Sequence, residues 1–249
     1  MTAPWIDLNA DLGEGCADDE SLLAVVTSAS IACGVHAGDA PTMAATVTAA
    51  ARRGVTVGAH PSYEDRPGFG RRHLDVAPAT LTAGLVAQIR ALRVVADGAG
   101  TAVTYVKPHG ALYGDMATDA STAEAVLDAL AAFGDLVLLA PAQSLATALA
   151  ADRAMPVVAE AFADRAYAPD GSLVPRSAPG ALIEDPDLAA EQAVRIATEG
   201  RIVTADGSSL ALEARSICVH GDAPGAAVRA HRVRRALETA GVTVRRFAP

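Results

Sequence analysis

The chain has 249 residues, of which 51% are hydrophobic and 20% are charged, so it is long enough for one globular domain over residues 1–249 whose core needs no disulfide or metal support. Its formal net charge of −9 disfavours a nucleic-acid partner. The three cysteines lack CxxC spacing, the N-terminus lacks signal-peptide character, and the sequence has no run of about 20 apolar residues. Together these features predict a cytoplasmic chain with no membrane partner.

The predicted strands are short apolar or β-branched segments that alternate with longer segments of helical periodicity, a pattern typical of βα units around a parallel sheet. They are expected at residues 6–9, 29–33, 55–59, 103–107, 136–140, 156–160, 216–220 and 242–247. Seven or eight such units in a chain of this length favour an α/β fold of the (β/α)-barrel type, and a doubly wound open sheet stays as the alternative.

The predicted helices lie between these strands, at residues 41–53, 79–97, 121–133, 186–199 and 224–240. The helix at 79–97 has the clearest pattern, because apolar residues such as Leu81, Leu85 and Leu92 recur at three- and four-residue spacing. An Asp-Gly pair between two short apolar runs predicts a β-hairpin at 201–212.

Polar residues gather where the predicted strands end, which is where active sites form in both α/β architectures. After the first strand come Asn9, Asp11 and Glu14, and strand alternation places Asp7 on the same face as the first two. Charged groups that point into a barrel need partners, so we expect these residues to line a solvated site. The alternative is that the acidic residues cap the next helix.

The second and third strands end in histidines. His36 follows Gly34, a residue that allows the backbone to approach a ligand closely, while Asp39 is interpreted as a helix N-cap. His60 ends the third strand ahead of a long loop, and loops of this length are often lids or binding loops. The arginines of this loop, Arg71 among them, either clamp an anion or are solvated.

The fourth strand ends in Lys107 and His109, which are two residues apart and therefore on one face. Lys107 is the only lysine in a chain with 19 arginines. This usage indicates a site that needs a compact ammonium group rather than a guanidinium group. The alternative is a surface lysine kept by chance.

The last two groups of candidates follow the sixth and seventh strands. The first group comprises Glu160, Asp164, Arg165 and Arg176. His220 and Asp222 precede a helix whose N-terminal amides are able to bind an anion, and Asp222 is a helix N-cap in the alternative interpretation. His73 and His231 lack a position at a strand end and are assigned to the surface.

Four histidines, each at a different strand end, are best explained by a single pocket: His36, His60, His109 and His220. Their separation matches no metal motif such as HExxH, and the sequence contains no Walker-type phosphate loop, GxGxxG or GxSxG segment. We therefore expect a pocket formed by residues that are distant in sequence.

Six sequence blocks, in order over nearly the whole chain, carry a family resemblance: DLNADLGEG, SASIACGVHAGD, VGAHPSYEDRPGFGRR, VKPHGALY, EAFADRAY and SICVHGDAPGAA. With them the chain resembles the LamB/YcsF family, whose members are the A subunits of the bacterial ATP-hydrolysing 5-oxoprolinase. Six separate blocks are far harder to match by accident than one short motif.

The resemblance implies a distorted (β/α) barrel of the glycoside hydrolase/deacetylase type that opens the lactam ring of 5-oxoproline to L-glutamate at the expense of ATP. It also implies separately encoded partner subunits B and C, in agreement with the lack of a phosphate loop here. Related deacetylases hold a divalent metal with one aspartate and two histidines, and the similar positions are Asp11, His60 and His109. The sequence leaves open whether a metal is bound and whether the chain forms a homo-oligomer.

An unstrained lactam is a poor electrophile, so its hydrolysis needs an activated carbonyl, a positioned water and stabilisation of negative charge. Phosphorylation of the amide oxygen would supply the activation. We expect Asp11 or a pocket histidine to act as general base, and Lys107 with a second histidine to stabilise the charge.

The substrate carboxylate would be held by Lys107, by Arg165 or by backbone amides near Gly34. The remaining candidate substrate contacts are Asn9, Glu14 and Asp222. Two rival functions stay open: a stand-alone metal-dependent amidase or deacetylase, and a noncatalytic substrate-binding subunit.

Overall fold

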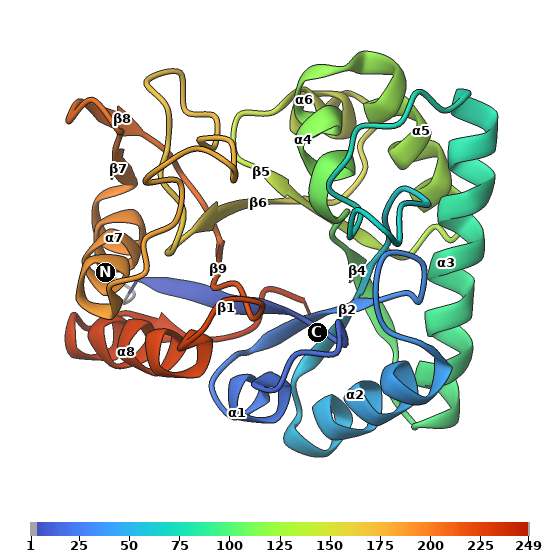
Figure 1. Ribbon diagram of the computed structural model, residues 1–249, viewed down its shortest axis with the longest axis horizontal. Helices are drawn as coiled ribbons and strands as arrows, with labels where there is room; N and C mark the ends of the chain where they lie inside the picture. Colours follow the sequence, from blue (N-terminus) through green and yellow to red (C-terminus); the bar gives the residue numbers. More distant parts are fainter. Residues whose placement is uncertain (1–3, 249) are drawn as a thin grey trace.

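The structure, a computed structural model that describes residues 4–248, is a parallel β-barrel with helices around it (Figure 1). Its helices are α1 (Asp19–Leu23), α2 (Ala40–Arg53), α3 (Pro78–Gly98), α4 (Gly110–Thr118), α5 (Ala120–Ala131), α6 (Leu145–Asp152), α7 (Pro186–Glu199) and α8 (Ala226–Thr239). Its strands are β1 (Trp5–Leu12), β2 (Ser28–Ala32), β3 (Thr56–His60), β4 (Val103–Val106), β5 (Val137–Pro141), β6 (Val157–Phe162), β7 (Arg201–Val203), β8 (Ser209–Ala211), β9 (Ser216–Cys218) and β10 (Thr243–Val244).

Seven parallel strands close the barrel in the order β1-β2-β3-β4-β5-β6-β9, because β9 pairs with both β6 and β1. The short strand β10 pairs with Trp5 and Ile6, ahead of the point at which β2 joins β1 at Asn9. All eight predicted strands are confirmed. The pattern had left a barrel and an open sheet as alternatives, and the pairing of β9 with β1 decides for the barrel.

Strand β1 shows why the interior of the barrel is polar. Its even-numbered residues, such as Ile6 and Leu8, belong to the hydrophobic core. Asp7, Asn9 and Asp11 instead form hydrogen bonds with residues of other strands and of the β4–α4 loop. The predicted alternation of these three residues is therefore confirmed. All three are buried, and each has the polar partners that burial requires.

Helix α2 shows how capping residues in the sequence set where a helix begins and ends. The Asp39 carboxylate accepts from the Thr42 N–H at 2.9 Å, which confirms it as the N-cap of α2, and Gly54 ends this helix with a φ of 65°. The five predicted helices are confirmed, as is the hairpin, formed by β7 and β8. Helices α1, α4 and α6 were not predicted, because they are short and have only weak amphipathic patterns.

Helix α3 is long and apolar enough, by length and composition alone, to cross a membrane, which differs from the expectation drawn from the sequence. In the structure it packs against β3, β4 and α5 in the outer layer of the barrel (Figure 1). Its Gln88 side chain donates to the Ser62 carbonyl and accepts from the Ser62 N–H. One helix of this length and composition is weak evidence of a membrane span.

Two long connections follow β3 and β6, at residues 61–77 and 163–185. In Figure 1 the first is the teal loop beside α4 and α3, and the second is the gold loop near β7 and β8. Both leave the carboxyl ends of barrel strands. They are therefore placed to cover the end of the barrel at which the candidate site lies.

Candidate functional site

A cavity of about 250 Å³ lies at the carboxyl ends of the barrel strands. Eight of the eleven predicted site residues line it: Asp11, Glu14, His60, Lys107, His109, Arg165, His220 and Asp222. They come from β1, from β3 and from the connections that follow β1, β4, β6 and β9. The convergence expected from the sequence is therefore found at the predicted end of the barrel.

The Lys107 ammonium group is surrounded by acceptors. Its Nζ lies 2.9 Å from Asp11 Oδ1 and 3.0 Å from Glu160 Oε1. Asn9 Oδ1 at 3.3 Å and Cys218 Sγ at 3.1 Å complete the surroundings. Burial lowers the pKa of Lys107, but the Asp11 carboxylate and the other acidic neighbours outweigh burial and hold this pKa well above its usual value. With its three N–H donors in use, Lys107 fixes carboxylates and is not free to bind a substrate carboxylate.

Three histidines converge on Glu14. Its Oε1 lies 3.2 Å from His36 Nε2, 3.3 Å from His109 Nδ1 and 3.9 Å from His60 Nε2. The rings of His36 and His109 stack with their centroids 3.9 Å apart, which places His36 behind the cavity wall. Glu14 does not cap α1, so that alternative is wrong.

Backbone carbonyls fix one ring nitrogen in each of two histidines. His60 Nδ1 donates to the Lys107 carbonyl at 2.6 Å, and His109 Nε2 donates to the Phe69 carbonyl at 2.8 Å, because a carbonyl only accepts. The other two nitrogens, His60 Nε2 and His109 Nδ1, then face each other at 2.9 Å. Two imidazole lone pairs repel at this distance, so either a proton or a metal cation lies between them.

Without a metal, the proton belongs to His60. Burial lowers the pKa of His60, but the adjacent Asp11 carboxylate outweighs burial and raises this pKa above its usual value. Burial and the charge of His60 hold the pKa of His109 well below its usual value. A cationic His60 therefore donates to a neutral His109, and the Asp11 carboxylate stabilises the charge.

His220 and Asp164 form a hydrogen-bonded pair beside the cavity. Asp164 Oδ1 accepts from His220 Nδ1 at 2.8 Å, and Asp164 Oδ2 accepts from the His220 backbone N–H at 2.9 Å. Burial raises the pKa of Asp164, but His220 outweighs burial and lowers it, so the carboxylate stays ionised. His220 Nε2 has no hydrogen-bond partner within residues 4–248 and is free to exchange a proton with a ligand.

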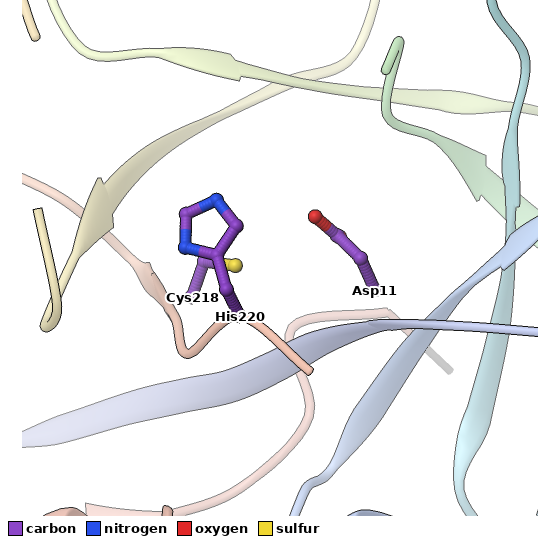
Figure 2. A group of neighbouring side chains, drawn as sticks. All are labelled: Asp11, Cys218 and His220. Carbon is purple, nitrogen blue, oxygen red and sulfur yellow. The ribbon is translucent and has the colours of Figure 1, made fainter. Parts of the chain in front are cut away.

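Two groups of side chains have ligand atoms close enough for a metal ion, and their chemistry separates them. In the first group, Asp11, Cys218 and His220 project from β1 and from the end of β9 on the same side of the barrel wall (Figure 2). The Lys107 ammonium already contacts Asp11 and Cys218, and burial holds the pKa of the Cys218 thiol well above its usual value. A second cation would be repelled there.

The second group, Glu14, His36 and His109, fits a metal better. Its ligand atoms lie within 4.8 Å of one another, and His60 Nε2 lies 2.9 Å from His109 Nδ1, one of these atoms. His60 Nε2 is also 3.5 Å from Asp11 Oδ2, so the set implied by the family resemblance lies at the same place. Imidazole and carboxylate ligands of this kind suit a divalent ion such as Zn²⁺.

The more exposed side of the cavity carries charged residues from both long loops. The Asp222 carboxylate pairs with Arg176, at 2.6 and 2.8 Å, and with Arg71. It therefore joins residues 61–77 to residues 163–185. Helix α8 has Gly225 as its N-cap, so the interpretation of Asp222 as a helix cap is wrong.

A model of the LamB/YcsF family matches residues 6–249. The chain belongs to the LamB/YcsF family. It is 54% identical to the 5-oxoprolinase A subunit of Streptomyces griseus, and the match covers 98% of this chain and 100% of that protein. It is 51% identical to a 5-oxoprolinase A subunit of Agrobacterium fabrum, with 98% of each chain covered. The resemblance drawn from the six sequence blocks is confirmed.

Solved structures agree with this family assignment. The chain is similar to a lactam utilization protein from Thermus thermophilus, with a TM-score of 0.91, 40% identity and coverage of 98% of this chain and 100% of that one. A family 4 carbohydrate esterase from Streptomyces lividans shares the fold at a TM-score of 0.53 and 14% identity, with 97% and 91% covered. The predicted likeness to the deacetylase barrel is therefore confirmed for the fold.

Asn9 and Gly34 do not line the cavity, in contrast to the roles expected for them. Asn9 Nδ2 donates to Glu160 Oε1 at 2.7 Å and to Ser216 Oγ at 2.8 Å, so it supports a buried carboxylate. The Gly34 carbonyl accepts from the Arg66 side chain at 3.0 Å. His73 and His231 are exposed, as predicted.

Two aromatic residues of the site were missed. Tyr113 Oη donates to Glu160 Oε2 at 2.7 Å, and the Phe162 ring stacks on His220 with centroids 5.3 Å apart. Both lie in the quoted sequence blocks. Phe162 is two residues after Glu160 on β6, so strand alternation would have placed it on the same face. Tyr113 is on α4, a helix that was not predicted.

Proposed function

We propose that this chain is the A subunit of an ATP-hydrolysing 5-oxoprolinase, which opens the lactam ring of 5-oxoproline to L-glutamate together with subunits B and C. The observation that carries the proposal is the 54% identity to a 5-oxoprolinase A subunit over nearly the full length of both chains. The cavity supports it, because it combines a histidine able to transfer protons with several fixed charges. The proposal includes one barrel domain and a cytoplasmic location.

His220 is the group best placed to move protons in this reaction. The lone pair of its Nε2 takes a proton from the attacking water, and the imidazolium then gives a proton to the ring nitrogen as the C–N bond breaks. The acyl phosphate left by this step is hydrolysed by a second water molecule to L-glutamate and inorganic phosphate. Asp164 holds Nδ1–H and stabilises the imidazolium. Asp11 is a weaker candidate for the base: burial raises its pKa, but the charges of His60 and Lys107 outweigh burial and lower it well below the usual value.

The activation of the lactam is assigned to the partner subunits. An amide carbonyl needs activation before water attacks it, and ATP-dependent phosphorylation of the amide oxygen supplies that activation. This chain has no Walker-type phosphate loop. We therefore assign ATP binding to subunits B and C, and hydrolysis of the activated lactam to the cavity of this chain.

A divalent metal belongs to the proposal as an optional component held by Glu14, His36 and His109. When bound, it would act as a Lewis acid on a carbonyl or a water molecule. The test is elemental analysis of the purified chain. Stoichiometric metal in the wild type and its loss in Glu14→Gln would establish the site. An active complex without metal would show instead that a proton carried by His60, and no metal ion, lies between His60 and His109.

The decisive experiment measures ATP-dependent formation of glutamate from 5-oxoproline, with this chain alone and with subunits B and C. Glutamate from the complete mixture only is the expected result. Hydrolysis of another amide by the isolated chain would instead favour a stand-alone metal-dependent amidase, the second candidate, which the Glu14, His36 and His109 cluster favours. Normal turnover of a saturated complex that carries His220→Asn would reduce the role of this chain to substrate binding.

A further inference from the structure

The outer part of the cavity carries more positive charge than its own carboxylate balances. Arg71, Arg165 and Arg176 all line the cavity there, and we call these three residues the arginine cluster. Asp222 pairs with Arg71 and Arg176. It is the one carboxylate that pairs with the arginine cluster among residues 4–248. The cluster therefore has a formal excess of two positive charges.

Arg165 is the member of the cluster without an acidic partner in the described part of the chain. Its Nη2 donates to the Val174 carbonyl at 2.7 Å and its Nε to the Ala181 carbonyl at 3.3 Å. The residue is only 7% exposed. Burial, followed by the charge of Arg176, lowers the pKa of Arg165, but a guanidinium group keeps its proton at neutral pH. A buried cation in a cavity wall normally has a counterion, so this position indicates an anionic ligand.

The deeper charges do not offer a second place for that anion. Lys107 contacts Asp11 and Glu160, and its donors are in use. His60 Nε2 lies 3.5 Å from Asp11 Oδ2 and 3.9 Å from Glu14 Oε1, so carboxylates of the chain already surround it. Among the side chains of residues 4–248 that line the cavity, only the arginine cluster therefore offers an entering anion more positive charge than the neighbouring carboxylates balance.

The size of the charge excess distinguishes between ligands. Free 5-oxoproline carries one carboxylate, whereas a lactam phosphorylated on its amide oxygen carries a carboxylate and a phosphoryl group. Guanidinium groups bind phosphate oxygens through paired N–H donors, which an ammonium group does not. A cavity of about 250 Å³ suits a small ring with one phosphoryl group better than a nucleotide.

We propose that the arginine cluster is a subsite for the phosphoryl group of an activated lactam, and that Asp222 occupies Arg71 and Arg176 until this ligand arrives. The inference rests on the proposed function. On binding, phosphoryl oxygens replace the Asp222 carboxylate at the two more exposed arginines, while Arg165 contacts the ligand from the cavity wall. The internal ion pair is thus exchanged for an ion pair with the ligand.

The test measures the binding of inorganic phosphate to the isolated full-length chain by titration calorimetry. We expect Arg176→Gln and Arg165→Gln to weaken phosphate binding about tenfold or more, because each removes a charge-assisted contact. Asp222→Asn should strengthen binding about tenfold, because it removes the competing carboxylate. This opposite sign is a result that a general loss of structure does not produce.

Arg93→Gln is the matched control, because Arg93 pairs with Asp135 on the outside of α3, away from the cavity. It should bind phosphate as the wild type does. Circular dichroism verifies that each variant is folded. Absence of saturable phosphate binding, or equal affinity in Asp222→Asn and the wild type, overturns the subsite. Tighter binding of ATP than of phosphate also overturns it, because the phosphoryl group recognised would then be that of a nucleotide.

The result separates this inference from the function on which it rests. Glutamate formation by the complete complex together with no phosphate binding by the isolated chain refutes the subsite and leaves the function intact. Phosphate binding that responds to the variants as expected, without any glutamate formation, supports a phosphoryl subsite at the arginine cluster but refutes both the function and the activated lactam as its ligand.

Discussion

Replacement of Lys107 by methionine is expected to destabilise the protein as well as to inactivate it. The variant leaves Asp11 and Glu160 buried without the cation that now lies 2.9 and 3.0 Å from them. Removal of one partner from a buried ion pair costs about 3–5 kcal/mol, and we expect the upper part of this range because two carboxylates share one cation.

The loss of stability should depend on pH. In the wild type the pKa of Asp11 lies well below its usual value, since the charges of His60 and Lys107 outweigh the effect of burial. Its contribution to the free energy of unfolding is therefore complete above about pH 4 and is lost only as pH falls through the lowered pKa. The variant loses one of the two charges that oppose the effect of burial on Asp11, so the pKa of this carboxyl group rises above its wild-type value, and the folded variant takes up a proton at a higher pH than the folded wild type does. The difference between the two proteins is then largest at pH 7 and shrinks toward pH 4.

Urea unfolding followed by circular dichroism at pH 7 and pH 5 measures this difference. The double variant Lys107→Met/Glu160→Gln is the control, because it removes one of the two unpaired carboxylates and should recover part of the loss. A loss below about 1 kcal/mol at pH 7, or an equal loss at both pH values, would refute the reasoning that Lys107 stabilises a buried pair of carboxylates.

Three further predictions concern other parts of the barrel. In the complete complex, the variants His220→Asn and Asp164→Asn should each lower kcat by about 10²–10⁴ with little change in KM. Each variant should also flatten the limb of the pH–rate profile that reports the general base, and an unchanged profile would assign proton transfer to another group. Burial raises the pKa of Asp7 to about 6, so ionisation of Asp7 should lower the stability of the wild type relative to Asp7→Asn by about 2 kcal/mol as pH rises from 4 to 6 in urea titrations; parallel curves would contradict it. Glu14→Gln should reduce metal content measured by elemental analysis, and equal metal in both proteins would place the ion elsewhere.

Local sequence patterns predicted much of the fold and identified most of the site residues. The alternation in β1 placed Asp7, Asn9 and Asp11 on one face, and helix periodicity located α3. Both patterns depend only on neighbouring residues and therefore survive without tertiary information. The position of polar residues after strands likewise identified Lys107 and the histidines as site candidates, because parallel strands end at one edge of the barrel.

The sequence alone did not determine the roles of these residues. Lys107 was expected to stabilise negative charge or to hold the substrate carboxylate, but its contacts with Asp11 and Glu160 use its donors. Asp222 was a candidate helix cap, but it pairs with Arg71, which lies 151 residues away. Such contacts depend on barrel closure and on the register between strands, neither of which a local pattern records.

The sequence by itself determined the strand and helix pattern, the family and the set of residues that gather at one end of the barrel. The tertiary structure decided that β9 closes the barrel against β1, which cavity histidine keeps a free nitrogen, and which cavity arginine has no acidic partner among residues 4–248. The physical reason is that hydrogen bonds and ion pairs act over a few ångströms, and only the folded chain sets distances between groups far apart in sequence.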